Sequence, residues 1–330
     1  MSEQAVVLEG VTKTFGDKRA VDALDLAIPA GSVCGYLGPN GAGKTTTIRM
    51  IMSIIYPDSG RIEVLGRASA IESKDRIGYL PEERGVYRKM KVGDFLAYIA
   101  RLKGAAAGAA LTKRIDGWLE RVQLADVRKK KCEQLSKGMQ QKVQFLATVI
   151  HDPDLVILDE PFSGLDPVNA RLLRTLIDEM RDAGKTIIFS THVLGSAEQL
   201  CDRVFMINRG KKVLDGPIDA IRAKFDPKTI VVEPADTAAN GAFSGSLGAL
   251  PGVKSVMRLG DRSAVYEAHL EDGTDPQGVI GAIATGLPVR RVELRKATLE
   301  DIFVSLVDPG DSEDSIRAAL KAESAEPVGA

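Results

Sequence analysis

The chain has 330 residues, with 44 Lys and Arg against 45 Asp and Glu, a net charge of −1, 44% hydrophobic residues and three cysteines. This length predicts about two domains. The balanced charge argues against a protein that works mainly by coating nucleic acid or an anionic membrane, because either activity needs a large basic excess.

The cysteines and the N-terminus indicate the cellular setting. Cys34, Cys132 and Cys201 form no CxxC pair, which disfavours a zinc site or a disulfide scaffold and is typical of a reducing compartment. The sequence has no apolar run of membrane-spanning length, and its first residues lack the features of a signal peptide. We therefore expect a cytosolic protein that reaches a membrane only peripherally, through a partner.

The first part of the chain alternates strand and helix signals. Residues 33–37 predict a buried strand, and a glycine-rich turn then leads into a helix predicted over 45–55. Apolar runs at 155–158 and 186–189 predict further buried strands separated by helical periodicity. This pattern is typical of an α/β sheet. Residues 83–150 are predicted to be largely helical.

The pattern changes after Pro217. Strands are predicted at 229–233, 255–259, 264–270 and 289–294, with helices at 242–250 and 276–285 between them. The order β-α-β-β-α-β predicts a small α+β, ferredoxin-like domain. From Asp308 the sequence carries six acidic and two basic residues, and we expect this tail to be flexible.

A phosphate-binding motif lies between the first buried strand and its helix. Residues 38–45 fit the pattern GxxxxGK[ST], whose backbone amides close around phosphate oxygens at a helix N-terminus. We expect Lys44 to contact the β- and γ-phosphates and the Thr45 hydroxyl to ligate magnesium. The predicted nucleotide-binding residues of this loop are Gly38, Pro39, Asn40, Gly41, Ala42, Gly43, Lys44, Thr45 and Thr46.

Two carboxylates follow the apolar run at 155–158. Asp159 and Glu160 come at the carboxyl end of this predicted strand, the edge where doubly wound sheets bind ligands. Alone, the pair would be an ordinary acidic helix cap at a strand exit. Together with the phosphate loop, it predicts that Asp159 holds magnesium through its water shell and that Glu160 activates the water attacking the γ-phosphate.

Residues 135–140, Leu-Ser-Lys-Gly-Met-Gln, resemble the LSGGQ signature of the ATP-binding subunits of ABC transporters. Ser136 and Gly138 match this signature, whereas Lys137 and Met139 depart from it. The resemblance covers about residues 4–220, and a weaker similarity continues through 299–303, an ending seen in ABC-2-type exporter ATPases of the Na⁺-exporter-like group.

The resemblance assigns roles to further residues. Asp166 corresponds to the D-loop, His192 to the switch histidine, and Phe15 to the aromatic residue that stacks on adenine. Glu82 stands where many members have the Q-loop glutamine, which reaches magnesium and links the site to the membrane partner. The implied catalytic residues are Glu160, His192 and Lys44; the implied magnesium ligands are Thr45, Asp159 and Glu82; and Phe15, Glu82, Ser136, Gly138 and Asp166 complete the nucleotide site.

The resemblance also implies an architecture. It predicts an α/β P-loop NTPase domain of the ABC type at 1–222, with a mixed or parallel sheet and a helical subdomain at about 83–150. The ferredoxin-like accessory domain would span 228–306 and the acidic tail 307–330. The sequence of the accessory domain shows no catalytic pattern, and a regulatory role, a dimer contact and a lid on the sheet edge all remain open.

The implied function is that of an ATP-hydrolysing motor that uses ATP and Mg²⁺. Two chains would sandwich two ATP molecules, with Ser136 and Gly138 acting in trans, and a separate membrane permease would hold the motor at the inner face of the cell membrane. Export is the expected direction, with import as the other, and no nucleic-acid partner is expected. The alternative is a soluble ABC-type ATPase that remodels ribosomes or DNA, although the sequence has neither a second ATPase module nor a long coiled coil.

Overall fold

The computed structural model describes residues 3–83, 85–225, 228–235, 240–259 and 264–307. The chain divides into two compact units, which we call unit 1 (Met1–Ile218 with Val304–Ala330) and unit 2 (Asp219–Phe303). The acidic tail from Asp308 onward lies outside the described residues.

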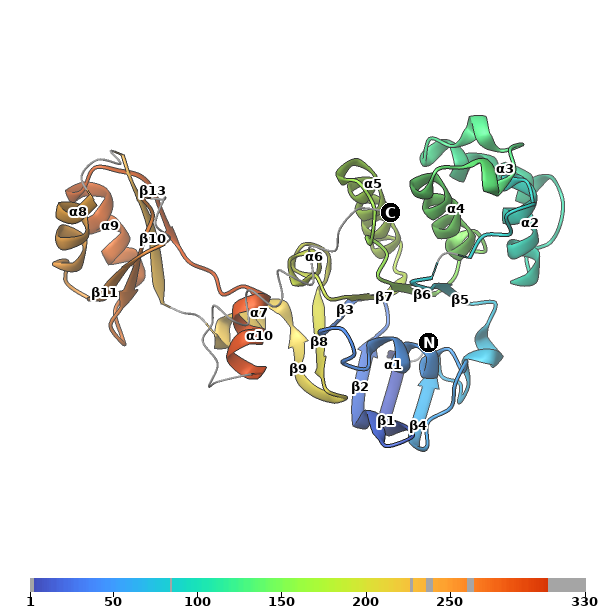
Figure 1. Ribbon diagram of the computed structural model, residues 1–330, viewed down its shortest axis with the longest axis horizontal. Helices are drawn as coiled ribbons and strands as arrows, with labels where there is room; N and C mark the ends of the chain where they lie inside the picture. The colour runs from blue at the N-terminus through green and yellow to red at the C-terminus, as the bar shows by residue number, and fades with distance from the viewer. Residues whose placement is uncertain (1–2, 84, 226–227, 236–239, 260–263, 308–330) are drawn as a thin grey trace. The chain divides into compact units, whose positions relative to one another are not determined.

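The centre of unit 1 is a sheet with the strand order β5-β6-β7-β3-β8-β9 (Figure 1). Neighbouring strands run parallel from β5 through β8, and β9 pairs antiparallel with β8 at the edge. Every residue of β3, β6 and β7 is buried, as expected for parallel strands covered on both faces. These strands confirm the predicted α/β sheet: β5 (Ile77–Leu80), β6 (Leu155–Asp159), β7 (Thr186–Thr191), β3 (Val33–Leu37), β8 (Arg203–Asn208) and β9 (Lys211–Pro217).

Helices follow three of the central strands. Helix α1 (Lys44–Ile51) comes after β3, α5 (Pro167–Asp182) after β6 and α6 (Leu194–Leu200) after β7. Because these strands are parallel, the segments that join strand to helix all lie at the same edge of the sheet. Residues 38–43, 160–166 and 192–193 are therefore brought to one place.

Helix α1 is shorter than the sequence indicated, since it ends at Ile51 and not at residue 55. Ser53 adopts a left-handed conformation with a φ of 55°, which a continuing helix does not allow. The Ser53 hydroxyl then accepts a hydrogen bond from the Ala70 backbone N–H at 3.2 Å. The apolar residues after Ile51 belong to the turn and misled the sequence prediction.

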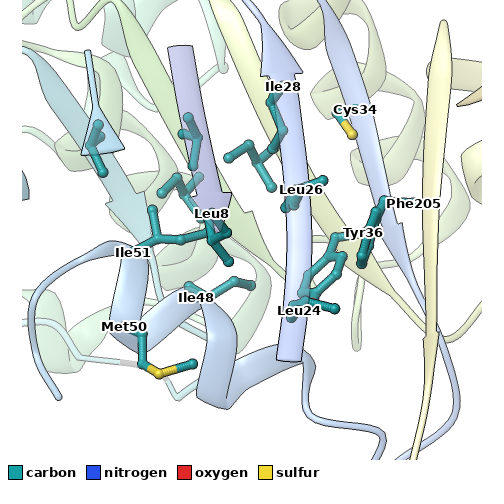
Figure 2. Close-up of a cluster of buried hydrophobic side chains, with 14 of the residues drawn as sticks. Leu8, Leu24, Leu26, Ile28, Cys34, Tyr36, Ile48, Met50, Ile51 and Phe205 are labelled. Atoms are coloured by element: carbon teal, nitrogen blue, oxygen red, sulfur yellow. The ribbon is translucent and has the colours of Figure 1, made fainter. Parts of the chain in front are cut away.

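A second sheet, with the order β2-β1-β4, encloses the core beside α1, and the sequence analysis did not predict it. Its antiparallel strands are β1 (Gln4–Phe15), β2 (Lys18–Pro29) and β4 (Ser59–Val64). Figure 2 shows Leu8, Leu24 and Leu26 from this sheet gathered around Ile48 of α1 and Tyr36 of β3. This packing fixes the helix that begins at the phosphate loop.

The region between β5 and β6 is largely helical, as predicted. It contains α2 (Val92–Leu102), α3 (Ala109–Arg121) and α4 (Lys137–Val149), with short 3₁₀ turns at Ala125–Val127 and Cys132–Gln134. Helix α4 begins within the signature-like sequence, at Lys137. Its first turn is capped by Ser136, whose Oγ accepts a hydrogen bond from the Met139 backbone N–H.

Unit 2 contains an antiparallel sheet with the strand order β11-β12-β10-β13. Helices α8 and α9 alternate with the strands as the sequence predicted, and this order agrees with a ferredoxin-like α+β fold. Its core includes Ile230, Val232, Phe243, Tyr266 and Ile283. The elements are β10 (Thr229–Pro234), α8 (Asn240–Gly248), β11 (Val253–Arg258), β12 (Tyr266–Leu270), α9 (Pro276–Gly286) and β13 (Val289–Leu294).

The remaining elements are a 3₁₀ turn at Ala70–Ser73 and two short helices, α7 (Ile218–Lys224) and α10 (Leu299–Val307). Within the described ranges, no helix has both the length and the apolar character that crossing a membrane requires.

Candidate active site

The phosphate loop connects β3 to α1 and is closely packed against neighbouring backbone. Gly38 has a φ of 151° and Gly43 a φ of 112°, conformations that residues with a side chain rarely adopt. A Cβ on Gly38 would lie 2.2 Å from the carbonyl oxygen of Ile207 in β8, and a Cβ on Gly43 would lie 2.5 Å from that of Ala20 in β2. Glycine is therefore required at both positions.

The Lys44 side chain folds into this loop and is buried. Its Nζ donates hydrogen bonds to the carbonyl oxygens of Gly38 at 2.7 Å and Pro39 at 3.2 Å. Gly43, the residue before α1, caps the helix without a side-chain hydrogen bond. The ammonium group and the N-terminal amides of α1 together concentrate positive charge at the loop, which favours phosphate binding.

Asp159 ends β6 and is only 1% exposed. Its Oδ1 accepts a hydrogen bond from Ser190 Oγ in β7, whereas its Oδ2 is buried without a hydrogen-bond partner among the described residues. Burial raises the pKa of Asp159, although the Ser190 hydrogen bond opposes this rise. A buried, unsatisfied carboxylate oxygen is costly, and a bound cation would relieve that cost.

Glu160 is held in place by the end of β7. Its Oε1 accepts a hydrogen bond from the His192 backbone N–H at 3.0 Å and lies 2.8 Å from His192 Nδ1, while its Oε2 accepts one from Thr191 Oγ1 at 3.2 Å. Because an ionised carboxylate only accepts hydrogen bonds, Nδ1 carries the proton in this contact. Glu160 also has a φ of 48°, a strained conformation of the kind that clusters at functional sites.

A cavity of about 330 Å³ joins the phosphate loop to Glu160. Phe15, half exposed at the end of β1, forms part of its wall, and Lys13 Nζ lies 5.6 Å from the centre of the Phe15 ring. The volume lies within the usual range for small-molecule sites. The lining residues are Phe15, Lys18, Ala20, Asn40, Gly41, Gly43, Lys44, Thr45, Thr46, Glu82 and Glu160.

Glu82, shortly after β5, brings a further carboxyl group to this site. It lines the large cavity and also a smaller one, of about 30 Å³, to which Asp159 and Glu160 contribute. Burial raises the pKa of Glu82, and the negative charges of Asp159 and Glu160 raise it further. Like charges this close together favour a bound cation or a protonated carboxyl group.

The side chains fit magnesium bound together with a nucleotide. Among the described residues, no group of three or more His, Cys, Asp or Glu side chains is placed to hold a metal by itself. The Thr45 hydroxyl, however, is near enough to Asp159 to lower the pKa of that carboxyl group. Magnesium commonly binds through one or two carboxylates together with substrate phosphates, and Thr45, Asp159 and Glu82 offer oxygen ligands of this kind.

Comparison with known proteins identifies the family. The ABC transporter family profile matches residues 21–163, and the C-terminal domain profile of the DrrA1-3-like ATP-binding proteins matches residues 216–307. An uncharacterized ABC transporter ATP-binding protein of Bacillus subtilis, YhaQ, is 40% identical over 302 residues, covering 92% of this chain and 98% of the relative. The chain belongs to the ATP-binding proteins of ABC transporters.

Two further comparisons agree with this ABC assignment. The Nod factor export ATP-binding protein I of Ralstonia nicotianae is 31% identical over 310 residues, covering 91% of this chain and 92% of the relative. A solved ATP-binding subunit of an ABC transporter aligns with a TM-score of 0.62 and 28% identity, covering 67% of this chain and 93% of that one. The predicted family, P-loop ABC fold and ATPase activity are confirmed, and the ribosome or DNA alternative finds no support in these matches.

Several predicted site residues of this ABC ATPase are not among those lining the nucleotide cavity. Gly38, Pro39, Ala42, Asp159 and His192 lie in the segments that adjoin it, whereas Ser136, Gly138 and Asp166 belong to the signature and the D-loop. Asp166 caps α5 and accepts a hydrogen bond from the Asn169 backbone N–H at 2.9 Å, and this bond holds the pKa of Asp166 below its usual range. A Cβ on Gly138 would lie 3.6 Å from Asn169 Nδ2. The signature and D-loop residues therefore lie next to one another.

The sequence analysis missed three polar residues that support the ABC ATPase site. Ser190 and Thr191 donate hydrogen bonds to Asp159 and Glu160 from the carboxyl end of β7. Their position directly before His192 was a usable signal, because polar residues at that strand end face the ligand edge. Gln141 of α4 gave no signal, since a glutamine within a helix usually lies on the surface.

Proposed function

We propose that this protein is the motor subunit of an ABC exporter and couples ATP hydrolysis to the movement of a separate membrane permease. The observation that carries the proposal is the convergence of Lys44, Glu82 and Glu160 on one cavity. The signature residue Ser136 caps α4, outside the lining of this cavity. The chain therefore offers a phosphate-binding loop and a base at the cavity, and a separate surface at α4 that could contact a second nucleotide.

Each residue at the cavity has a distinct proposed role. Lys44 and the amides of the phosphate loop neutralise the phosphates, and Phe15 stacks on the adenine ring. Glu160 orients and deprotonates the attacking water, while His192 fixes the direction of the Glu160 carboxylate. Thr45, Asp159 and Glu82 would hold Mg²⁺, which when bound offsets negative charge on the phosphates.

The signature and D-loop residues act across a dimer in this proposal. Ser136 and Gly138 of one chain would contact the nucleotide held by a second copy or a related subunit, with Asp166 beside them. Support comes from the position of Ser136 at the N-terminus of α4, where backbone amides favour an anion. The γ-phosphate then stabilises the closed dimer, and hydrolysis removes that contact.

Export and membrane attachment rest on the relatives. The name of the Ralstonia protein states Nod factor export, and another solved relative, from Clostridium perfringens, is described as part of an ABC transporter complex. The absence of a spanning helix among the described residues agrees with a permease on a separate chain. We propose a cytoplasmic subunit held at the inner face of the membrane by that permease, with domains at 1–222 and 228–306.

The test is the variant Glu160→Gln, which keeps the shape of the side chain but removes its basicity. We expect turnover to fall at least about 100-fold, because general-base catalysis commonly contributes that much. With MgATP the variant should form a stable dimer that dissociates when ATP is removed, as measured by light scattering. A variant that stays monomeric with MgATP, or keeps its activity, would overturn the proposed mechanism.

A further inference from the structure

Helix α4 carries a row of buried polar side chains, although polar groups are usually excluded from such positions. Gln141, Gln144 and Thr148 are 8%, 6% and 5% exposed, and their spacing places them on one face of the helix. Burying them is costly unless each finds a hydrogen-bond partner. Each of the three contacts at least one backbone carbonyl of a segment that adjoins the carboxylates Glu82 or Glu160.

Gln141 makes the contacts closest to the chemistry. Its Nε2 donates hydrogen bonds to the carbonyl oxygens of Pro161 at 2.8 Å and Ser163 at 3.2 Å, in the turn directly after Glu160. The amide orientation is determined by these contacts, because a carbonyl oxygen cannot accept from Oε1. Both amide hydrogens thus hold the turn that follows the proposed base.

The other two residues are hydrogen-bonded to β5 and to the segment that follows it, which carries Glu82. Gln144 Nε2 donates to the carbonyl oxygen of Glu83 at 3.2 Å, one residue after Glu82. Thr148 Oγ1 lies 3.4 Å from the Tyr79 carbonyl oxygen of β5 and 3.0 Å from its own helix at Gln144. Helix α4 is therefore hydrogen-bonded to the chain on both sides of the cavity that Glu82, Asp159 and Glu160 line.

The turn after Glu160 is held by its own hydrogen bond and by packing of an aromatic ring. The Ser163 N–H donates to the Glu160 carbonyl oxygen at 3.1 Å, which closes the turn. Its Phe162 ring packs edge to face on Phe189 at 5.4 Å and lies under the Arg174 guanidinium. A shift of the turn relative to α4 would therefore displace the Glu160 backbone itself, and with it the carboxylate.

We infer that Gln141 is a positioning residue, which aligns the Glu160 base only when Ser136, at the start of α4, is in contact with a nucleotide. Ser136 caps α4 and Gln141 lies five residues further along it, about 7.5 Å along the helix axis. This inference rests on the proposed function, in which Ser136 of each chain contacts the nucleotide of the other. When Ser136 contacts the ATP held by the partner chain, Gln141 transmits the resulting position of α4 to Glu160, the base that hydrolyses the ATP of its own chain. The two nucleotide sites are thereby coupled.

The test compares Gln141→Met with Lys142→Met in the full-length protein. Gln141→Met keeps the length of the side chain but removes the donor. Lys142→Met is the matched control on the same helix, because the Lys142 Nζ donates to the Val122 carbonyl oxygen at 3.2 Å, away from the turn after Glu160. For Gln141→Met we expect kcat to fall about tenfold or more, equivalent to about 1.4 kcal/mol in the activation barrier. The KM for ATP should stay within about twofold, and the Hill coefficient for ATP should fall towards one.

A purely structural role predicts a different result, in which the melting temperature and ATP affinity fall together in Gln141→Met. That result would overturn the inference, as would an unchanged kcat or an equal loss of kcat in Lys142→Met. The double variant Glu160→Gln/Gln141→Met separates the inference from the proposed function. It should still form the MgATP dimer, because Gln141 acts on the base and not on closure. If Glu160→Gln alone fails to dimerise, it is the proposed function that fails.

Discussion

At the scale of single residues, the site depends on two adjacent carboxylates in different surroundings. Asp159 is enclosed at the end of β6, and one of its oxygens has no hydrogen-bond partner among the described residues. Glu160 is only slightly more exposed, yet both of its oxygens contact the strand end at Thr191 and His192. Asp159 is therefore suited to bind a cation, and Glu160 to hold a fixed direction.

The burial of Asp159 predicts a gain in stability when its charge is removed. Because burial raises its pKa, the folded chain binds this proton more tightly than the unfolded chain. As the pH rises above about 4, the ordinary pKa of an aspartate, the Asp159 carboxyl group lowers the free energy of unfolding by an increasing amount. Above the pKa that Asp159 has in the folded chain, this loss becomes constant. Asp159→Asn should raise the melting temperature by a few degrees at neutral pH and abolish magnesium-dependent ATP hydrolysis.

Calorimetry from pH 4 to pH 8, without nucleotide or metal, checks this prediction. The difference between Asp159→Asn and the unmodified protein should shrink towards the acidic end. Asp154→Asn is the matched control, because Asp154 is half exposed in a surface ion pair with Arg76 and should change little. An Asp159→Asn variant that is less stable at neutral pH would show that burying the Asp159 charge does not destabilise the folded chain.

Much of the site could be predicted residue by residue, because its chemistry depends on a few residue types at strand ends. Lys44, Glu82 and Glu160 were predicted from motif spacing and family resemblance, and they do share one cavity. The supporting contact of Gln141 could not be predicted. Its role depends on which carbonyl groups the turn after Glu160 presents to α4, and that is a property of the folded chain.

At the scale of elements, the phosphate loop packs against strands of two sheets. Gly38 lets the loop approach β8, and Gly43 lets it approach β2, more closely than a side chain would permit. Buried strands such as β3 and β6 were easy to predict, because their sequences are continuously apolar. Strands β1 and β2 alternate buried and exposed residues with bulges, which weakens that periodic signal.

The close packing of the phosphate loop predicts different losses of stability for two alanine substitutions within it. Gly43→Ala combines a φ of 112° with a Cβ placed 2.5 Å from the Ala20 carbonyl oxygen, so either the loop or β2 must move. We expect a loss of about 3 kcal/mol in stability and of measurable ATP binding. Gly41→Ala meets no atom within 4 Å and has only the backbone strain of its φ of 75°, at a cost of about 1 kcal/mol.

Denaturant unfolding and binding of a fluorescent ATP analogue distinguish these two substitutions. The comparison is internal, because both residues belong to the same loop and both have positive φ. Equal losses of stability in Gly43→Ala and Gly41→Ala would mean that backbone conformation, and not contact with β2, requires the glycine at position 43.

At the scale of the whole molecule, the chain combines an ATPase unit with a second unit that has its own core. The ferredoxin-like fold of unit 2 was predictable because its strands and helices are separated by clear turn signals. The buried ion pair between Glu267 and Arg295 was not predictable, because these residues are 28 positions apart in the sequence. Glu267 of β12 is 2% exposed and pairs with Arg295, which also bonds Asp301 at 3.1 Å.

Arg295→Met should destabilise unit 2 by about 3 kcal/mol, because it leaves the Glu267 carboxylate buried without its counter-charge. Hydrogen exchange of the β12 amides, Tyr266–Leu270, measures this loss in unit 2 directly. The matched control is Arg290→Met, whose pair with Glu233 is exposed to solvent and should contribute less than about 1 kcal/mol. The double variant Glu267→Met/Arg295→Met should regain most of the loss, because it removes the buried charge together with its partner. If it stays as unstable as Arg295→Met alone, Arg295 stabilises unit 2 through packing of its side chain and not through its charge.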